Sequence, residues 1–153
     1  MTAAPYEIVL ETGWSDMDMN GHMANTAYLE KAVDVRLRYF AAHHLGTGDF
    51  ARLRVGPVVM TDEIGYFREV HLLEALRATL ALAGLAADGS RWRLRNEFYR
   101  GDGQLAARVT SVGGWLDLDA RRLIAPPPPL AAALAGLART DHFTELPSSL
   151  RPR

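Results

Sequence analysis

The sequence lacks several features that would point to particular classes of protein. It has no cysteine, so disulfides, thiolate zinc sites and a cysteine nucleophile are excluded. No apolar run reaches the roughly 18 residues that a membrane helix needs. The first residues, MTAAPYEIVLE, lack the basic start and the long apolar stretch of a signal peptide. We therefore expect a cytoplasmic protein without a membrane segment.

An excess of either charge is also absent. Seventeen Lys and Arg residues stand against eighteen Asp and Glu residues, for a formal net charge of −1. A dedicated nucleic-acid binder usually carries a net basic face, so we expect no nucleic-acid partner. Lysine is scarce as well, because Lys31 is the only one in the chain. A phosphate site would therefore use arginine, whose planar fork suits phosphate.

What is present fits one folded domain. The chain has 153 residues, of which 48% are hydrophobic and 23% charged, close to the globular average. Residues 6–14 show the mixed pattern of a partly buried strand, and a mostly buried helix follows from Asn25 or Thr26, both N-cap types, to about residue 45. A connection over 47–57 has room for one helical turn. Further strands are expected at 58–70, 76–85, 91–100 and 105–118.

Turn signals at 88–89 and 101–103 join the last strands as hairpins, and Gly65 is expected to mark a bulge. One long helix against an antiparallel sheet of about five strands gives a two-layer α+β fold. Such a sheet exposes an edge strand. Pairing with a second copy would cover that edge, so we expect a homodimer, or a homotetramer built from it.

The C-terminal part differs in composition from the rest. The proline run 126–129 should end the sheet and start a short helix over 130–137, and the polar residues 140–153 are expected to form a loose or partner-docked extension. We assign residues 1–125 to the main domain and residues 126–153 to a Pro-rich, helical extension of that same domain.

Two carboxylates precede the long helix. Asp16 and Asp18 flank a turn signalled by Asn20-Gly21. A helix start presents unpaired N–H groups with partial positive charge, which can polarise a carbonyl oxygen. A nearby carboxylate can attack that carbonyl or activate water. The arrangement suits acyl transfer. The alternatives are that the carboxylates only cap a turn and that the following His22 only bonds to the backbone.

The segment DMDMNGHMANTAY, residues 16–28, resembles the signature of hotdog-fold acyl-CoA thioesterases, and more narrowly that of the 4-hydroxybenzoyl-CoA thioesterase family. Ile64 and Tyr66 match the family's I-x-Y, and the resemblance extends over about residues 6–125. Ala24 departs from it, since the motif usually has Asn there. The resemblance implies a hotdog fold, in which the antiparallel sheet wraps around one long central helix. It also implies hydrolysis of a thioester to a free acid and CoA.

The resemblance further implies roles for single residues. Asp18 falls on the catalytic aspartate, as nucleophile or general base, and the backbone N–H of Asn25 falls where the carbonyl is polarised. Asp16 would hold the turn. We count His22 with Asp18 and Asn25 as the candidate catalytic residues. The candidate substrate-binding residues are Gly21, Met23, Tyr28, Glu63, Arg91 and Arg93.

Several of these candidates have a second interpretation. Arg91 and Arg93 share one face of a strand and could contact the phosphates of CoA, or that face could simply be solvated. Arg68 and Arg77 are further options for the same contact. Of the neighbours Asp62 and Glu63, one must face the helix, where it positions water or forms a salt bridge. Trp14 and Tyr28 are expected to be packing residues.

No metal and no cofactor is expected, apart from CoA as part of the substrate and product. An alternative function is a non-catalytic hotdog domain that binds an acyl-CoA or an acyl-carrier-protein thioester. A hotdog dehydratase or isomerase would place a His and a carboxylate differently, and we find no such motif.

Overall fold

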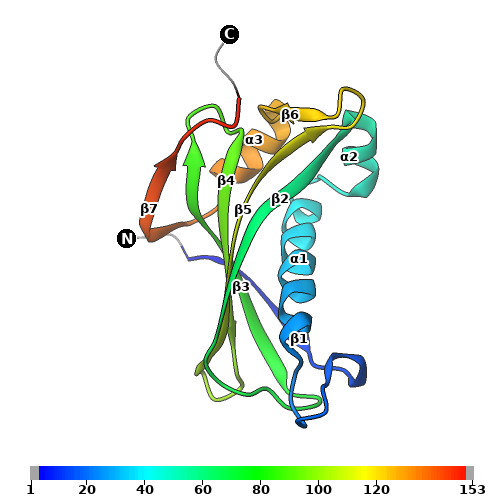
Figure 1. Ribbon diagram of the computed structural model, residues 1–153, viewed down its shortest axis with the longest axis vertical. Coiled ribbons are helices and arrows are strands. Elements are labelled where there is room, and N and C mark those ends of the chain that lie inside the picture. Colours follow the sequence, from blue (N-terminus) through cyan, green and yellow to red (C-terminus); the bar gives the residue numbers. More distant parts are fainter. Residues whose placement is uncertain (1–3, 151–153) are drawn as a thin grey trace.

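A long helix lies across one face of a twisted sheet in the computed structural model, which describes residues 4–150 (Figure 1). The expected α+β class is confirmed, with one long helix and two short ones. The helices are α1 (Asn25–Ala42), α2 (Thr47–Leu53) and α3 (Pro128–Ala135), and a short 3-10 turn covers Trp14–Asp16. The strands are β1 (Tyr6–Glu11), β2 (Val55–Tyr66), β3 (Ala75–Ala86), β4 (Arg91–Tyr99), β5 (Leu105–Asp117), β6 (Arg122–Ile124) and β7 (Arg139–Leu146).

Within residues 4–150 the sheet has seven strands, two more than predicted. The expected antiparallel strands run in the order β1-β3-β4-β5-β2, and β6 adds to β5. The seventh strand, β7, pairs with β3 in parallel. The prediction of a loose extension was therefore wrong for this part of the tail. The reason lies in β1, which has six residues and pairs with β3 only up to Leu80, whereas β7 pairs with β3 from Leu82 onwards. Backbone groups that β1 leaves unpaired thus find partners in β7.

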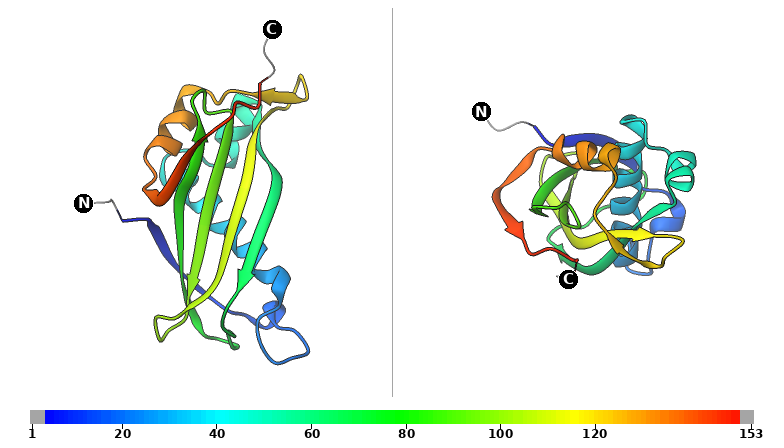
Figure 2. Two further views of the ribbon diagram at one scale, coloured as in Figure 1. Left: turned by 60° about the vertical axis from the view of Figure 1, so that its left-hand side comes forward. Right: turned by 90° about the horizontal axis from the view of Figure 1, so that it is seen from above.

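The core lies between α1 and the sheet. Buried and half-buried residues alternate along β4, with Trp92, Leu94 and Phe98 buried towards α1. The helix in turn buries seven of its residues, among them Tyr28, Arg36 and Phe40. Figure 2 shows α1 behind the sheet. Large side chains of both layers form one core cluster between them. Each large apolar side chain buried there contributes roughly 1.5–3 kcal/mol.

Some local details differ from the prediction. Helix α1 has Ala24 as its N-cap, so neither Asn25 nor Thr26 caps it with a side chain. The β-bulge lies between Val59 and Thr61 and not at Gly65. A Cβ atom at Gly65 would lie 2.8 Å from the outer end of the Phe67 ring, so the two side chains would crowd each other. No helix within residues 4–150 is long and apolar enough to cross a membrane.

Candidate active site

The loop before α1 is held from both sides by ionic and backbone contacts. The Oδ2 atom of Asp16 accepts the N–H of Gly13 at 2.8 Å and lies 3.1 Å from Nζ of Lys31. Lys31 also donates to the carbonyl of Glu11 at 3.1 Å. The side chains of Asp16 and Lys31 are each only 15% exposed, so this pair fastens the loop to the helix. Asp16 holds the turn, as the resemblance implies.

The turn that follows is tight and needs glycine at its tip. Gly21 has φ of +80°, a left-handed conformation that glycine adopts without strain. The N–H of Asp18 donates to the carbonyl of His22 at 3.0 Å, and that of Met23 donates to Val70 at 2.7 Å. The second bond ties this turn to the connection between β2 and β3. Two loops that are distant in the sequence therefore meet beside the start of α1.

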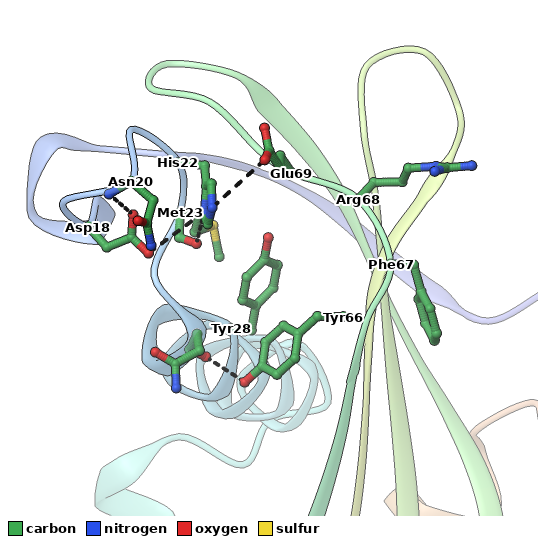
Figure 3. A pocket seen from close by; sticks show the side chains of 10 residues that line it. Asp18, Asn20, His22, Met23, Tyr28, Tyr66, Phe67, Arg68 and Glu69 are labelled. Carbon is green, nitrogen blue, oxygen red and sulfur yellow. Dashed lines mark hydrogen bonds and ion pairs between the residues drawn. The ribbon is translucent and has the colours of Figure 1, made fainter.

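A cavity of about 420 Å³ opens where these loops meet (Figure 3). Five of the nine candidate site residues line it: Asp18, His22, Met23, Asn25 and Tyr28. Gly21 shapes the turn but does not line the cavity. The remaining lining residues are Asn20, Tyr66, Phe67, Arg68 and Glu69.

Asp18 is the carboxylate at the mouth of this cavity. Its Oδ1 atom accepts the N–H of Asn20 at 2.9 Å, which fixes the side chain. Its Oδ2 atom lies 3.7 Å from Nδ1 of His22, and the side chain is 25% exposed. One carboxylate oxygen is thus held by the turn while the other remains available to a reactant.

His22 lies between two carboxylates. Its Nδ1 atom is 3.2 Å from the carbonyl oxygen of Met23, and its Nε2 atom is 3.9 Å from Oε1 of Glu69. When Nδ1 carries the proton it donates to Met23, and Nε2 is then free to accept a proton. The ring can therefore take part in proton transfer.

The helix start faces the same cavity. Ala24 offers no side-chain cap, and the N–H of Asn25 has no hydrogen-bond acceptor within residues 4–150. Such an N–H, with the partial positive charge of a helix start, can polarise a carbonyl oxygen. The hydroxyl of Tyr66 donates to the carbonyl of Asn25 at 3.0 Å and braces this turn of the helix.

Comparison with known proteins identifies the family. A model of the thioesterase-like superfamily matches residues 12–134, most of the chain. The chain belongs to the thioesterase-like superfamily. The resemblance to hotdog-fold acyl-CoA thioesterases is thereby confirmed. No curated protein matches the chain.

Solved structures support the same fold. A hypothetical protein of Staphylococcus aureus in complex with CoA has 21% identity, covers 88% of this chain and 84% of its own, and gives a TM-score of 0.80. The 1,4-dihydroxy-2-naphthoyl-CoA thioesterase of Synechocystis has 18% identity, with coverage of 88% and 98% and a TM-score of 0.78. A probable thioesterase of Escherichia coli has 20% identity, with coverage of 86% and 98% and a TM-score of 0.69. At these identities the likeness establishes the fold.

In this thioesterase-like chain two aromatic residues that were expected to pack, Tyr28 and Trp14, differ in burial. Tyr28 is buried and packs edge-on against Tyr66 and Phe98, with ring centroids 5.5 and 5.8 Å apart. Burial, helped by nearby acidic groups and Tyr66, raises the pKa of Tyr28 to about 12, so its phenol stays neutral. Trp14, in contrast, is 81% exposed, so the expectation that it packs was wrong. It lies in the 3-10 turn, which no sequence pattern signalled.

Three candidates lie away from the cavity. Arg91 donates to Ser149 at 3.2 Å and Arg93 donates to Thr144 at 3.1 Å, so both arginines hold the C-terminal segment. Glu63 is exposed on β2 and does not line the cavity. The arginine that does line it is Arg68, whose Nε donates to Gln104 at 2.8 Å. Arg68 was one of the further options for the CoA phosphates. The placement of Glu69 depends on how the β2–β3 connection folds, and no local motif revealed it.

A separate polar network lies deeper in the thioesterase-like fold. Arg36, on α1 and 6% exposed, donates from Nε to Asn96 at 3.1 Å and from Nη2 to Ser111 at 2.6 Å. The hydroxyl of Ser111 donates in turn to Asp62. Burial lowers the pKa of Arg36 to about 10, opposed by Asp62, so the side chain remains a cation at neutral pH. Asp62, and not Glu63, is thus the carboxylate that faces the helix layer.

Beyond this network lies a second, smaller cavity of about 120 Å³, with side chains of α1 on one side and of the sheet on the other. Its lining is almost entirely apolar and includes Leu37, Phe40, Trp92, Leu94 and Trp115. No group of three or more His, Asp or Glu side chains within residues 4–150 has the arrangement of a metal site.

Proposed function

We propose that the protein hydrolyses an acyl-CoA thioester to a free acid and CoA, with Asp18 as the main catalytic group. The observation that carries this proposal is the pairing of the Asp18 carboxylate with the uncapped start of α1 at one cavity. Membership of the thioesterase-like superfamily supports the reaction class. The CoA complex of the structural neighbour from Staphylococcus aureus supports the choice of thiol.

In the proposed reaction the thioester carbonyl oxygen accepts the N–H of Asn25. Acting as a general base, Asp18 takes a proton from water while the water oxygen bonds to the carbonyl carbon. The carbon–sulfur bond then breaks and gives the acid and the CoA thiolate, which takes up a proton from solvent to become the thiol. Acting as a nucleophile, Asp18 would bond to the carbonyl carbon itself, and water would hydrolyse the resulting anhydride. In both routes the helix start stabilises the negative charge that develops on the carbonyl oxygen.

The lining residues suggest how the substrate lies. Arg68 is an arginine that lines the cavity beside Asp18, so we propose that it contacts a CoA phosphate there, whereas Arg91 and Arg93 bond to the C-terminal segment. The phenol of Tyr28 stays neutral and can donate a hydrogen bond without adding charge. Met23 and the ring of Phe67 provide apolar surface beside the thioester.

We also propose that two copies form a dimer through β2. This strand has twelve residues and pairs on one side only, with β5. Large apolar side chains are exposed along the strand and on the adjacent face of α1, including Val59, Met60, Val33 and Leu37. A long unpaired edge next to exposed apolar surface is a favourable site for a second copy.

The test of the activity is Asp18→Asn, which keeps the shape of the side chain and removes its basicity. Hydrolysis of short-chain, long-chain and aryl CoA thioesters should fall by about 10²- to 10⁴-fold, as expected for loss of a general base. The matched control is Asp34→Asn on the exposed face of α1, where the side chain is 48% exposed and pairs with Arg38. Unchanged turnover in Asp18→Asn across the panel would contradict the proposal.

The second candidate is a domain that binds thioesters without hydrolysing them. It is favoured by the departure from the family motif at Ala24 and by the position of Trp14, which lies exposed outside the cavity. Saturable binding of an acyl-CoA to the wild-type protein without release of thiol would select this alternative.

A further inference from the structure

Acidic and histidine side chains alternate in a series of contacts that starts at Asp18 and leads away from the cavity. Beyond the contact of His22 with Glu69, the Oε2 atom of Glu69 lies 3.6 Å from Nε2 of His71. The Nδ1 atom of His71 lies 3.8 Å from Oε2 of Glu74. We call this series from Asp18 to His71 the acid–base chain. It joins two loops, and Figure 3 shows His22 between Asp18 and Glu69.

The acid–base chain leads from the cavity to solvent. The exposed fraction of the side chain is 25% for Asp18 and 28% for His22, but 63% for Glu69 and 56% for His71. The inner members are fixed by the turn and by the bond from Met23 to Val70. The outer members belong to the connection between β2 and β3, where the N–H of His71 donates to Glu74 at 3.0 Å. The chain is therefore anchored at both of its ends and exposed in its outer half.

Thioester hydrolysis releases a proton that such a route can carry. Water and the thioester give a carboxylic acid and a thiol, and the acid is ionised at neutral pH, so one proton leaves the site in each turnover. Asp18 accepts a proton when water attacks and must lose it before the next cycle. A substrate that fills the cavity also blocks the direct path of solvent to Asp18.

We propose that His22, Glu69 and His71 form a proton relay that returns Asp18 to its ionised form. This inference rests on the proposed function. Asp18 gives its proton to Nδ1 of His22, and the ring releases the proton of Nε2 to Glu69. Glu69 passes it to His71 or to solvent. The ring then donates from Nδ1 to the carbonyl of Met23 and exchanges protons with water to restore the starting tautomer. Each gap of 3.6 to 3.9 Å closes with a small side-chain rotation or with one bridging water.

Other charged and titratable groups face the acid–base chain. Arg68 and the two phenols of Tyr28 and Tyr66 line the same cavity. Arg100 lies beside Glu74, with Nε 3.6 Å from Oε1. Arg68 is already bonded to Gln104, and Tyr28 holds its proton up to a pKa of about 12. Arg68 and Tyr28 therefore do not compete with His22 for the proton of Asp18. Glu69 is the group to which the geometry lets His22 pass that proton.

Glu69→Gln tests the relay, because it keeps the size of the side chain and removes its ability to carry a proton. With a reactive short-chain acyl-CoA in dilute buffer, we expect kcat to fall about tenfold, at the low end of acid–base effects because the residue acts through His22. We expect KM to change less than twofold, since substrate binding is not removed. Added imidazole should restore kcat in the variant and leave the wild type unchanged, because a small buffer can accept the proton in place of Glu69.

Two further variants separate a chemical role from a structural one. Glu69→Asp retains a carboxylate and should recover most of the lost kcat. Glu145→Gln removes a similarly exposed carboxylate on β7 and should behave as the wild type. Wild-type kcat in Glu69→Gln, or a loss that imidazole does not restore, would overturn the relay. Full activity in Asp18→Asn would instead overturn the proposed function, so the two failures are distinguishable.

Discussion

Two polar networks of this protein differ in almost every physical property. The network around Arg36 is buried, is built on α1 and the sheet, and has donor–acceptor distances of 2.6 and 3.1 Å. The acid–base chain that starts at Asp18 is half-exposed, is built on loops, and has separations of 3.6 to 3.9 Å. Buried charges are tolerated only with close partners. Loose exposed contacts contribute little stability but allow protons and partners to exchange. The first network therefore stabilises the fold, and the second is free to perform chemistry.

The largest expected effect on stability is in the buried network around Arg36. Arg36→Ala should lower the free energy of unfolding by about 3 to 5 kcal/mol, because it leaves Asn96 and Ser111 without their charged partner. The measurement is urea unfolding at a fixed protein concentration. Arg38→Ala is the control, since Arg38 is on the same helix but 58% exposed, and it should cost less than about 0.5 kcal/mol. Equal losses in the two variants would remove the distinction between the networks.

An intermediate effect is expected where the helix holds the catalytic loop. Lys31→Met removes the ionic contact with Asp16 and the bond to Glu11, so stability should fall by about 2 kcal/mol. The kcat for thioester hydrolysis should fall with it, since Asp18 lies in the same loop. Thermal unfolding and turnover of the same preparation check both effects. A stable variant with full activity would show that the loop does not depend on this anchor.

A smaller effect on stability is expected for the turn at Gly21, and here the sign of the change is the test. Gly21→Ala should destabilise by about 1 kcal/mol, because φ of +80° is unfavourable for alanine although no atom lies near the new Cβ. Gly48→Ala, in α2 and equally free of neighbours, should stabilise by about 0.5 kcal/mol. Melting temperatures of the pair should move in opposite directions. Shifts of the same sign would contradict the assigned backbone conformation.

The smallest expected effect completes the comparison. A double-mutant cycle between His22 and Glu69, with glutamine at each position, should give a coupling in stability below about 0.5 kcal/mol. The corresponding cycle between Arg36 and Ser111, which bond directly and are both buried, should give more than 1 kcal/mol, of the size expected within a buried network. Both couplings come from urea unfolding of four variants each. A coupling above 1 kcal/mol for His22 and Glu69 would assign the acid–base chain to stability.

Sequence patterns predicted those parts of the molecule that depend on neighbours along the chain. The motif from Asp16 to Tyr28 is continuous, so its loop and the helix that follows it were located from sequence alone. The five main strands and both glycine turns also carry local signals. The expected bulge at Gly65 was wrong, because the shift in register lies earlier in β2, between Val59 and Thr61.

The remaining features depend on pairing between distant segments. Strand β7 reads RTDHFTEL, which is polar and carries no strong strand signal, and it becomes a strand because β3 has a free edge beside it. Glu69 and Arg68 reach the cavity only because the connection after β2 folds back to meet Met23. Arg91 was assigned to CoA from its spacing, and its partner Ser149 is 58 residues away.

The way in which β3 is covered also bears on how far the sheet can grow. Beside β3 the edge of the sheet consists of two short strands, β1 and β7. They run in opposite directions because β1 is antiparallel and β7 parallel to β3. An edge broken in this way is a poor template for a further strand, whereas β2 offers twelve residues without a break in the chain. In two copies joined along β2, both outer edges of the combined sheet would consist of the short strands β1 and β7. Assembly along the sheet would then end at a closed pair instead of continuing into a fibre.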